Sequence, residues 1–139
     1  MSAEESTTPD PVERWQEAAE AYARRDFDAG IFAPDAVWDF SSAGFGIFEG
    51  VAACRSFLED WLGAYEEYEY KQEEALDLGN GVLFVVASIG GRLAGSAGRV
   101  QERWAYTVAW ANGMVTSVIV RLDIDEARAA AERLAESRE

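Results

Sequence analysis

The residue best suited to acid–base chemistry is Asp39, because aromatic residues stand on both sides of it. Trp38 precedes it and Phe40 follows it. Partial desolvation by such neighbours would raise the pKa of the carboxyl group and make it basic enough to abstract a proton. Strand alternation argues the reverse, because a strand that turns Trp38 and Phe40 inward turns Asp39 toward solvent. The sequence leaves both interpretations open.

A base of this kind works with a hydrogen-bond donor that stabilises the negative charge developing on the substrate. Tyr106 or Tyr65 could be that donor. Arg121 could orient a ligand anion, although pairing with an acid at the surface is the simpler expectation. Residues 78–122 contain one acid, Glu102, so their arginines would either attract an anionic ligand or pair with acids on other segments.

The composition excludes several kinds of site. The chain carries 26 acidic and 12 basic residues, for a formal charge of −14, with one cysteine and no histidine. Catalysis through a histidine and metal ligation through imidazole are therefore absent, and we expect neither a metal nor a cofactor. A polyanion is repelled by nucleic acid and by anionic lipid, so neither is an expected partner. The single Cys54 cannot form an internal disulfide, which favours a cytoplasmic protein.

The length indicates one domain. The chain has 139 residues, of which 49% are hydrophobic, enough to bury a core without disulfides. We expect residues 1–9 to form a disordered acidic tail and residues 10–136 to form a single domain.

The first third of the chain predicts two helical segments and a strand. Asp10 is a good N-cap for a helix that begins at Pro11 and ends near Arg25. A short second helical turn is expected to run through Phe32 and to end at Pro34. Residues 36–40 predict a short strand.

The rest of the chain predicts a helix, an antiparallel meander and a closing helix. After Gly50, an apolar stripe at helical spacing runs to Tyr65, and the period then changes to two over residues 68–78. Further strands are expected at 82–89, 100–110 and 114–122, with Gly90-Gly91 opening the second hairpin. A helix capped by Asp123 or Asp125 closes the chain. The fold class is α+β, with helices on one face of a strongly curved antiparallel sheet.

Large rings and one cation recur at positions that could line a pocket in such a sheet. A filled core is the alternative, because rings at helical or strand period usually serve packing. The candidate ligand-binding residues are Trp38, Phe40, Phe57, Trp61, Tyr65, Trp104, Tyr106 and Arg121.

Several local sequences resemble the SnoaL-like branch of the nuclear-transport-factor-2-like, cystatin-like superfamily. They are the segments 22–28 and 32–40, Phe48-Glu49-Gly50, the segment 55–58, and the ending from Asn112 through Asp123. The resemblance covers roughly residues 12–132. It implies a cone-shaped domain with about three helices around a bent sheet, a homodimer formed through that sheet, and a pocket that serves catalysis or binding in relatives.

The known catalytic patterns of these relatives are incomplete here. Isomerase-like members place a base Asp before a Pro, a position that falls on Phe40, one residue after Asp39. Cyclases of this branch use a His, and epoxide hydrolases use an Asp-Arg-Asp set that the later strands lack. The leading hypothesis is therefore binding of a small apolar or aromatic molecule. The alternatives are an isomerase or cyclase with Asp39 as general base, and a non-catalytic dimerisation or interaction module.

Overall fold

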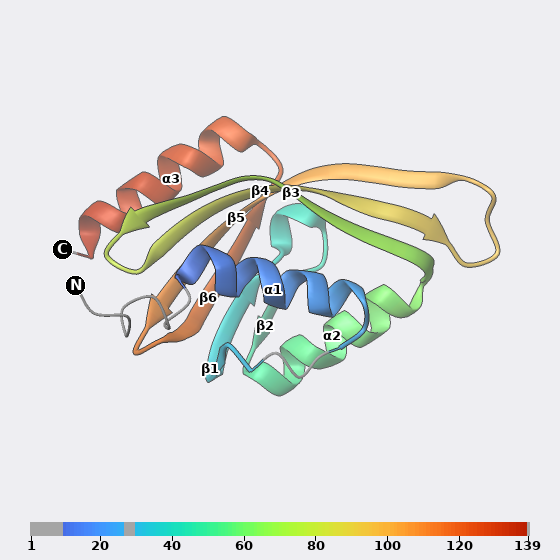
Figure 1. The fold of residues 1–139 in the computed structure, drawn as a ribbon, viewed down its shortest axis with the longest axis horizontal. Coiled ribbons are helices and arrows are strands. Elements are labelled where there is room, and N and C mark those ends of the chain that lie inside the picture. Colours follow the sequence, from blue (N-terminus) through green and yellow to red (C-terminus); the bar gives the residue numbers. More distant parts are fainter. Residues whose placement is uncertain (1–9, 27–29, 139) are drawn as a thin grey trace, which may run out of the picture.

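The computed structural model describes residues 10–26 and 30–138, so the predicted tail at residues 1–9 lies outside the described part. Three helices surround a six-stranded, strongly curved sheet (Figure 1). The helices are α1 (Pro11–Ala23), α2 (Val51–Gly63) and α3 (Ile124–Ser137), with a 3-10 turn, η2 (Ser41–Ala43). The strands are β1 (Phe32–Asp39), β2 (Ile47–Glu49), β3 (Tyr65–Gly79), β4 (Val82–Leu93), β5 (Arg99–Ala111) and β6 (Met114–Arg121). The α+β cone predicted from the sequence is thus confirmed.

The sheet has the order β2-β1-β6-β5-β4-β3 and includes one parallel pair. Strands β3 to β6 form the predicted antiparallel meander, while β1 runs parallel to β6. The predicted helical turn through Phe32 is wrong at its end, because Phe32 begins β1 and pairs with Val115. Pro34 lies within β1, where the register shifts between Phe32 and Val37, which suits a residue that cannot donate to a ladder.

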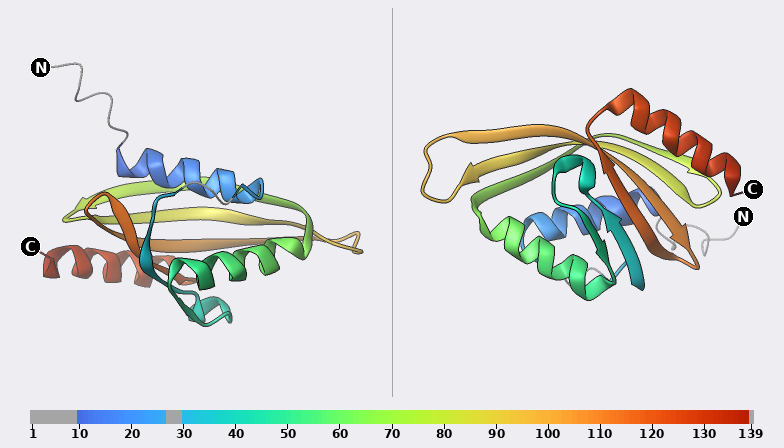
Figure 2. Two further views of the ribbon diagram at one scale, coloured as in Figure 1. Left: turned by 90° about the horizontal axis from the view of Figure 1, so that it is seen from below. Right: turned by 180° about the vertical axis from the view of Figure 1, so that it is seen from behind.

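Helices cover both faces of the sheet, which corrects the expectation of one covered face. On β4, Leu83 and Val85 belong to the core beneath α1 and α2, whereas Val82 and Phe84 pack with α3 on the other side. Figure 2 shows α1 and α3 on opposite sides of the strands. The reason is local, since β4 is apolar at consecutive positions and both its faces must be covered.

Gly90 and Gly91 lie inside β4 and do not open the hairpin, which is a second correction. A Cβ at Gly90 would lie 2.0 Å from the carbonyl oxygen of Val100 on β5. A Cβ at Gly91 would lie 1.8 Å from that of Glu67 on β3. Only glycine lets three strands approach this closely, and the hairpin turns beyond them (Figure 1).

Charge pairing accounts for the arginines near this hairpin. Arg92, Arg99 and Arg103 on β4 and β5 form ion pairs with glutamates of β3. These exposed pairs are each worth little for stability, and together they offset part of the negative charge of β3. No helix in the described ranges is long and apolar enough to cross a membrane.

Candidate functional site

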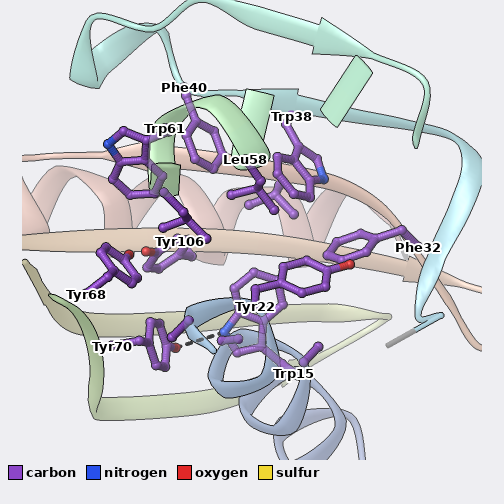
Figure 3. Close-up of a pocket in the computed structure, with 15 residues that line it drawn as sticks. Trp15, Tyr22, Phe32, Trp38, Phe40, Leu58, Trp61, Tyr68, Tyr70 and Tyr106 are labelled. Atoms are coloured by element: carbon purple, nitrogen blue, oxygen red, sulfur yellow. Dashed lines mark hydrogen bonds between the residues drawn. The ribbon is translucent and has the colours of Figure 1, made fainter. Parts of the chain in front are cut away.

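A small cavity lies between α1, α2 and the inner face of the sheet, and aromatic rings form most of its lining (Figure 3). Its volume is about 60 Å³. Alanines of α1, Leu62 and Val118 complete the wall. The larger lining residues are Trp15, Tyr22, Phe32, Trp38, Phe40, Leu58, Trp61, Tyr68, Tyr70 and Tyr106.

On each helix or strand, the spacing of the aromatic residues matches the periodicity of that element, so their rings share the face that borders the cavity. Trp15 and Tyr22 are seven residues apart on α1 and therefore share a face of the helix. Tyr68 and Tyr70 are two apart on β3 and both turn toward the cavity, while the glutamates beside them turn outward. Tyr106 comes from β5, whose even-numbered residues face the inner core.

The tyrosine hydroxyls are the main polar groups of the cavity. The indole N–H of Trp15 donates to the Tyr70 hydroxyl at 3.0 Å, and that hydroxyl donates to Oε1 of Gln72 at 2.9 Å. The hydroxyls of Tyr68 and Tyr106 point toward each other (Figure 3). Burial raises the pKa of all three tyrosines well above the ordinary value of a phenol, so they stay protonated near neutral pH.

A further donor belongs to Trp38, whose buried indole nitrogen has no acceptor in the described part of the chain. Among residues 10–26 and 30–138, the lining contains no Asp, Glu, His, Lys, Arg or Cys. The cavity can therefore hold apolar atoms and donate hydrogen bonds to an acceptor, but it contains no group with the pKa of a general base.

Asp39 lies outside this lining. It is at the end of β1 between two inward rings, and its Oδ1 accepts hydrogen bonds from Ser41, at 2.5 Å from Oγ and 3.1 Å from N. These bonds, with a smaller contribution from Arg121, hold the pKa of the Asp39 carboxyl below its usual value. Such a carboxylate is a weaker base than an ordinary one.

The other candidate residues fall into three groups. Trp38, Phe40, Trp61 and Tyr106 line the cavity. Phe57, Tyr65 and Trp104 pack around Trp61 but do not line the cavity. The Trp104 ring stacks on the Trp61 ring, with 5.2 Å between the ring centroids. Tyr65 begins β3 and is not on α2, which ends two residues earlier. Arg121 lies on the outer side of the sheet beside α3.

The prediction missed five of the aromatic lining residues, namely Trp15, Tyr22, Phe32, Tyr68 and Tyr70. The helical stripe of α1 and the alternation of β3 already marked four of them as inward. Phe32 carried no such signal, because its strand pairs with a distant segment.

A larger cleft adjoins the cavity. It measures about 470 Å³ and shares Tyr22, Phe32, Trp38 and Leu58 with the cavity. Cys54 also borders it, 3.7 Å from the Phe48 carbonyl oxygen, and burial raises the pKa of its thiol to about 11. The thiol is therefore a packed group and a poor nucleophile. In the ranges that the structure describes, no three acidic, histidine or cysteine side chains group as a metal site would require.

The curved sheet, the three helices and the ring-lined interior define a cone-like α+β protein of the nuclear-transport-factor-2-like class. Residues 12–118 match the model of the SnoaL-like domain, and the chain belongs to that family.

Solved structures agree on the fold. A nuclear-transport-factor-2-like protein of unknown function from Burkholderia pseudomallei K96243 is 18% identical with a TM-score of 0.70, covering 86% of this chain and 95% of its own. A proposed polyketide cyclase from Sinorhizobium meliloti is 24% identical with a TM-score of 0.63, covering 84% and 97%. A proposed SnoaL-like polyketide cyclase from Shewanella putrefaciens CN-32 is 12% identical with a TM-score of 0.69, covering 91% and 98%. The sequence matched none of the curated proteins with which it was compared.

Proposed function

We propose that this domain binds a small apolar or aromatic molecule in the ring-lined cavity and performs no acid–base catalysis there. The observation that carries the proposal is the lining itself, which in the described part of the chain consists of rings and aliphatic groups, with protonated tyrosines as its ionisable side chains. Apolar clefts with a few convergent polar groups are the usual form of a small-molecule site.

The polar groups narrow the ligand class. Tyr68 and Tyr106 bring hydroxyl groups to the cavity wall, and among the described lining residues there is no carboxylate to accept a bond from the ligand. We therefore propose a ligand that carries a ring and at least one acceptor oxygen, such as a carbonyl. Two of the structural neighbours are described as proposed polyketide cyclases, which supports an organic ligand of this kind.

The volume sets a condition on binding. A cavity of about 60 Å³ is smaller than the roughly 150 Å³ that accommodates benzene in an engineered protein cavity. A ring must therefore displace some of the side chains that separate the cavity from the 470 Å³ cleft, among them Tyr22, Phe32 and Leu58. We expect ligand binding to join the two spaces.

Thermal denaturation with a panel of aromatic ketones and their parent hydrocarbons tests the proposal. Ketones should raise the melting temperature more than the hydrocarbons do. Tyr106→Phe should weaken ketone binding about tenfold, the worth of one hydrogen bond, and leave hydrocarbon binding unchanged. Tyr65→Phe, outside the cavity, is the matched control. If no compound stabilises the protein, or if both variants behave alike, the proposal fails.

The enzyme alternative makes a different prediction for Asp39. A general base would be needed for turnover of any substrate that is found, so Asp39→Asn would abolish it. Because Asp39 is bonded to Ser41 outside the cavity, we expect Asp39→Asn to leave ligand affinity unchanged within about twofold. Activity assays of both proteins with any compound that binds decide between the two: turnover that is lost in Asp39→Asn would support the enzyme alternative, and no turnover by either protein would contradict it.

Association of two copies through the sheet stays a prediction. It would cover the outer side of β1 and β6, which α3 leaves free, since α3 contacts chiefly β4 and β5. Light scattering at tens of micromolar protein should give twice the monomer mass of 15.3 kDa. A monomeric mass would contradict it.

A further inference from the structure

A separate hollow, distinct from the cavity and the adjoining cleft, lies on the outer side of the sheet. The strands separate it from the ring-lined cavity. It measures about 390 Å³ and is bounded by α3, β5 and β6. Its floor includes Thr107 and Arg121, and Arg133 stands on its helical wall.

The helix turns one stripe toward this hollow. Ala130, Arg133, Leu134 and Ser137 follow the three- and four-residue spacing of one helical face. The adjacent stripe, Ala127, Ala131 and Ala135, is buried against the sheet and fixes the helix in place. The hollow therefore lies between a helix packed on the sheet and two strands of that sheet.

Both arginines lack partners, which distinguishes them from most others in the chain. Seven arginines form ion pairs or donate to backbone carbonyls, for example Arg128 to Glu74 and Arg138 to the Trp110 oxygen. Within residues 10–26 and 30–138, the side chains of Arg121 and Arg133 form no ion pair or hydrogen bond. In a chain of charge −14, two unpaired guanidinium groups in one hollow need an explanation.

Two buried polar atoms in the hollow also lack partners. Thr107 is only 2% exposed, and its hydroxyl has no hydrogen-bond partner among the described residues. The buried Nε of Arg121 is likewise unsatisfied. A buried polar group without a partner costs roughly 1–3 kcal/mol, so native proteins seldom keep one without a reason.

One acid, Asp39, is close enough to Arg121 for their charges to interact. Its Oδ1 is nevertheless occupied by Ser41, and the two residues form no ion pair. The guanidinium group therefore remains able to take another anion.

We propose that this hollow binds a small organic oxyanion, either a carboxylate or a phosphate monoester carrying a short apolar group. The guanidinium groups of Arg121 and Arg133 would bind the oxygens, and the Thr107 hydroxyl would donate to one of them. Ile119, Ala130 and Leu134 form an apolar wall for the remainder of the ligand. This site is independent of the function proposed for the ring-lined cavity.

Nuclear magnetic resonance of the arginine Nε–H groups tests the proposal at constant ionic strength. The probes are butyrate, n-propyl phosphate and 1-butanol, which share an apolar chain and differ in charge. We expect saturable shifts of the Arg121 and Arg133 signals with at least one anion and none with butanol. The anion that binds more tightly identifies the headgroup.

Variants make the test specific. Arg133→Gln and Thr107→Val should each raise the dissociation constant about tenfold or more. Thr107→Val should also keep or increase stability, because it removes an unpaired hydroxyl. Arg24→Gln removes the same charge from an arginine at the end of α1, away from the hollow, and should change nothing. Absence of saturation with both anions, equal binding of butanol, or an equal loss in Arg24→Gln would overturn the proposal. Arg133 is exposed, so its variant decides the matter even if Thr107→Val does not fold.

Discussion

Shortening Leu58 tests whether the cavity is usable space. This residue lines both the cavity and the cleft and is 7% exposed. Leu58→Ala removes three carbon atoms, worth about 2.4 kcal/mol at roughly 0.8 kcal/mol each. The space left behind adds to this cost, so we expect a loss near 3 kcal/mol, within the range of about 2–5 kcal/mol for such changes. For a domain of this size that loss lowers the melting temperature by about 10 °C.

The diagnostic result is rescue by a ligand. In Leu58→Ala the volume of the removed atoms joins the existing 60 Å³ and approaches the space that accepts benzene. Benzene at a hundredfold excess over its dissociation constant would then restore about 2.7 kcal/mol. Urea denaturation followed by tryptophan fluorescence, with and without benzene, measures this difference.

Leu83→Ala is the matched control. Leu83 is 1% exposed in the same core but borders neither the cavity nor the cleft, so shortening its side chain leaves an isolated space. Its variant should be destabilised by a similar amount and gain less than about 0.5 kcal/mol from benzene, because the hole is too small for the ring. Equal rescue of the two variants, or no rescue of Leu58→Ala, would refute the assignment of the cavity as a binding space.

Three further predictions concern other parts of the molecule. Burial raises the pKa of Tyr68 and Tyr106, so their contribution to stability is complete below about pH 10 and is lost as the pH rises further. Absorbance titration should show that these two tyrosines ionise only when the protein unfolds. Ionisation of all tyrosines together in the folded state would contradict this. Cys54, with a pKa of about 11, should react with a thiol reagent at pH 8 only after denaturant is added; fast stoichiometric reaction of the native protein would show that it is accessible. Gly91→Ala should lower the stability measured by thermal denaturation by about 3 kcal/mol or more, because its Cβ would meet a carbonyl oxygen of β3. Gly95 lies in open space with φ +76°, so Gly95→Ala should cost only about 1–2 kcal/mol. Equal losses in the two variants would argue against the close approach of the strands.

Local signals predicted much of the fold correctly. Asp10 caps α1, with Oδ1 accepting from the Glu13 amide at 2.9 Å, and Asp123 caps α3 in the same way. The Asn80 and Asn112 turns adopt the positive φ that such hairpins require. These features depend on neighbours within a few residues, which is why they can be predicted from the sequence.

The errors concern contacts between distant segments. Phe32 and Pro34 fit the end of a helix, but a strand more than eighty residues later pairs with this segment and draws it into the sheet. Gly90 and Gly91 resemble turn residues, and only the close approach of β5 and β3 shows why they lie inside β4. The position of α3 on the outer face likewise depends on which side of β4 the other helices have covered.

The candidate site was predicted only in part, because some of its residues follow from local periodicity and others depend on contacts between distant segments. Inward rings such as Trp38 and Tyr106 follow from alternation, and the structure brings them together in one cavity. Alternation placed Tyr68 and Tyr70 on one face of a half-exposed strand, but the sequence does not show that this face borders the same cavity as Trp38 and Tyr106. The side of the sheet on which Arg121 lies depends on how β6 pairs with its neighbouring strands, and this register cannot be predicted from the sequence alone.

The most direct test of the binding hypothesis is a crystal structure of the protein with the compound that gives the largest thermal stabilisation. We expect electron density for the compound between α1, α2 and β5, with its oxygen near the Tyr68 and Tyr106 hydroxyls and with Phe32 or Leu58 displaced. A compound bound elsewhere, with the ring cluster unchanged and the cavity still closed, would contradict it.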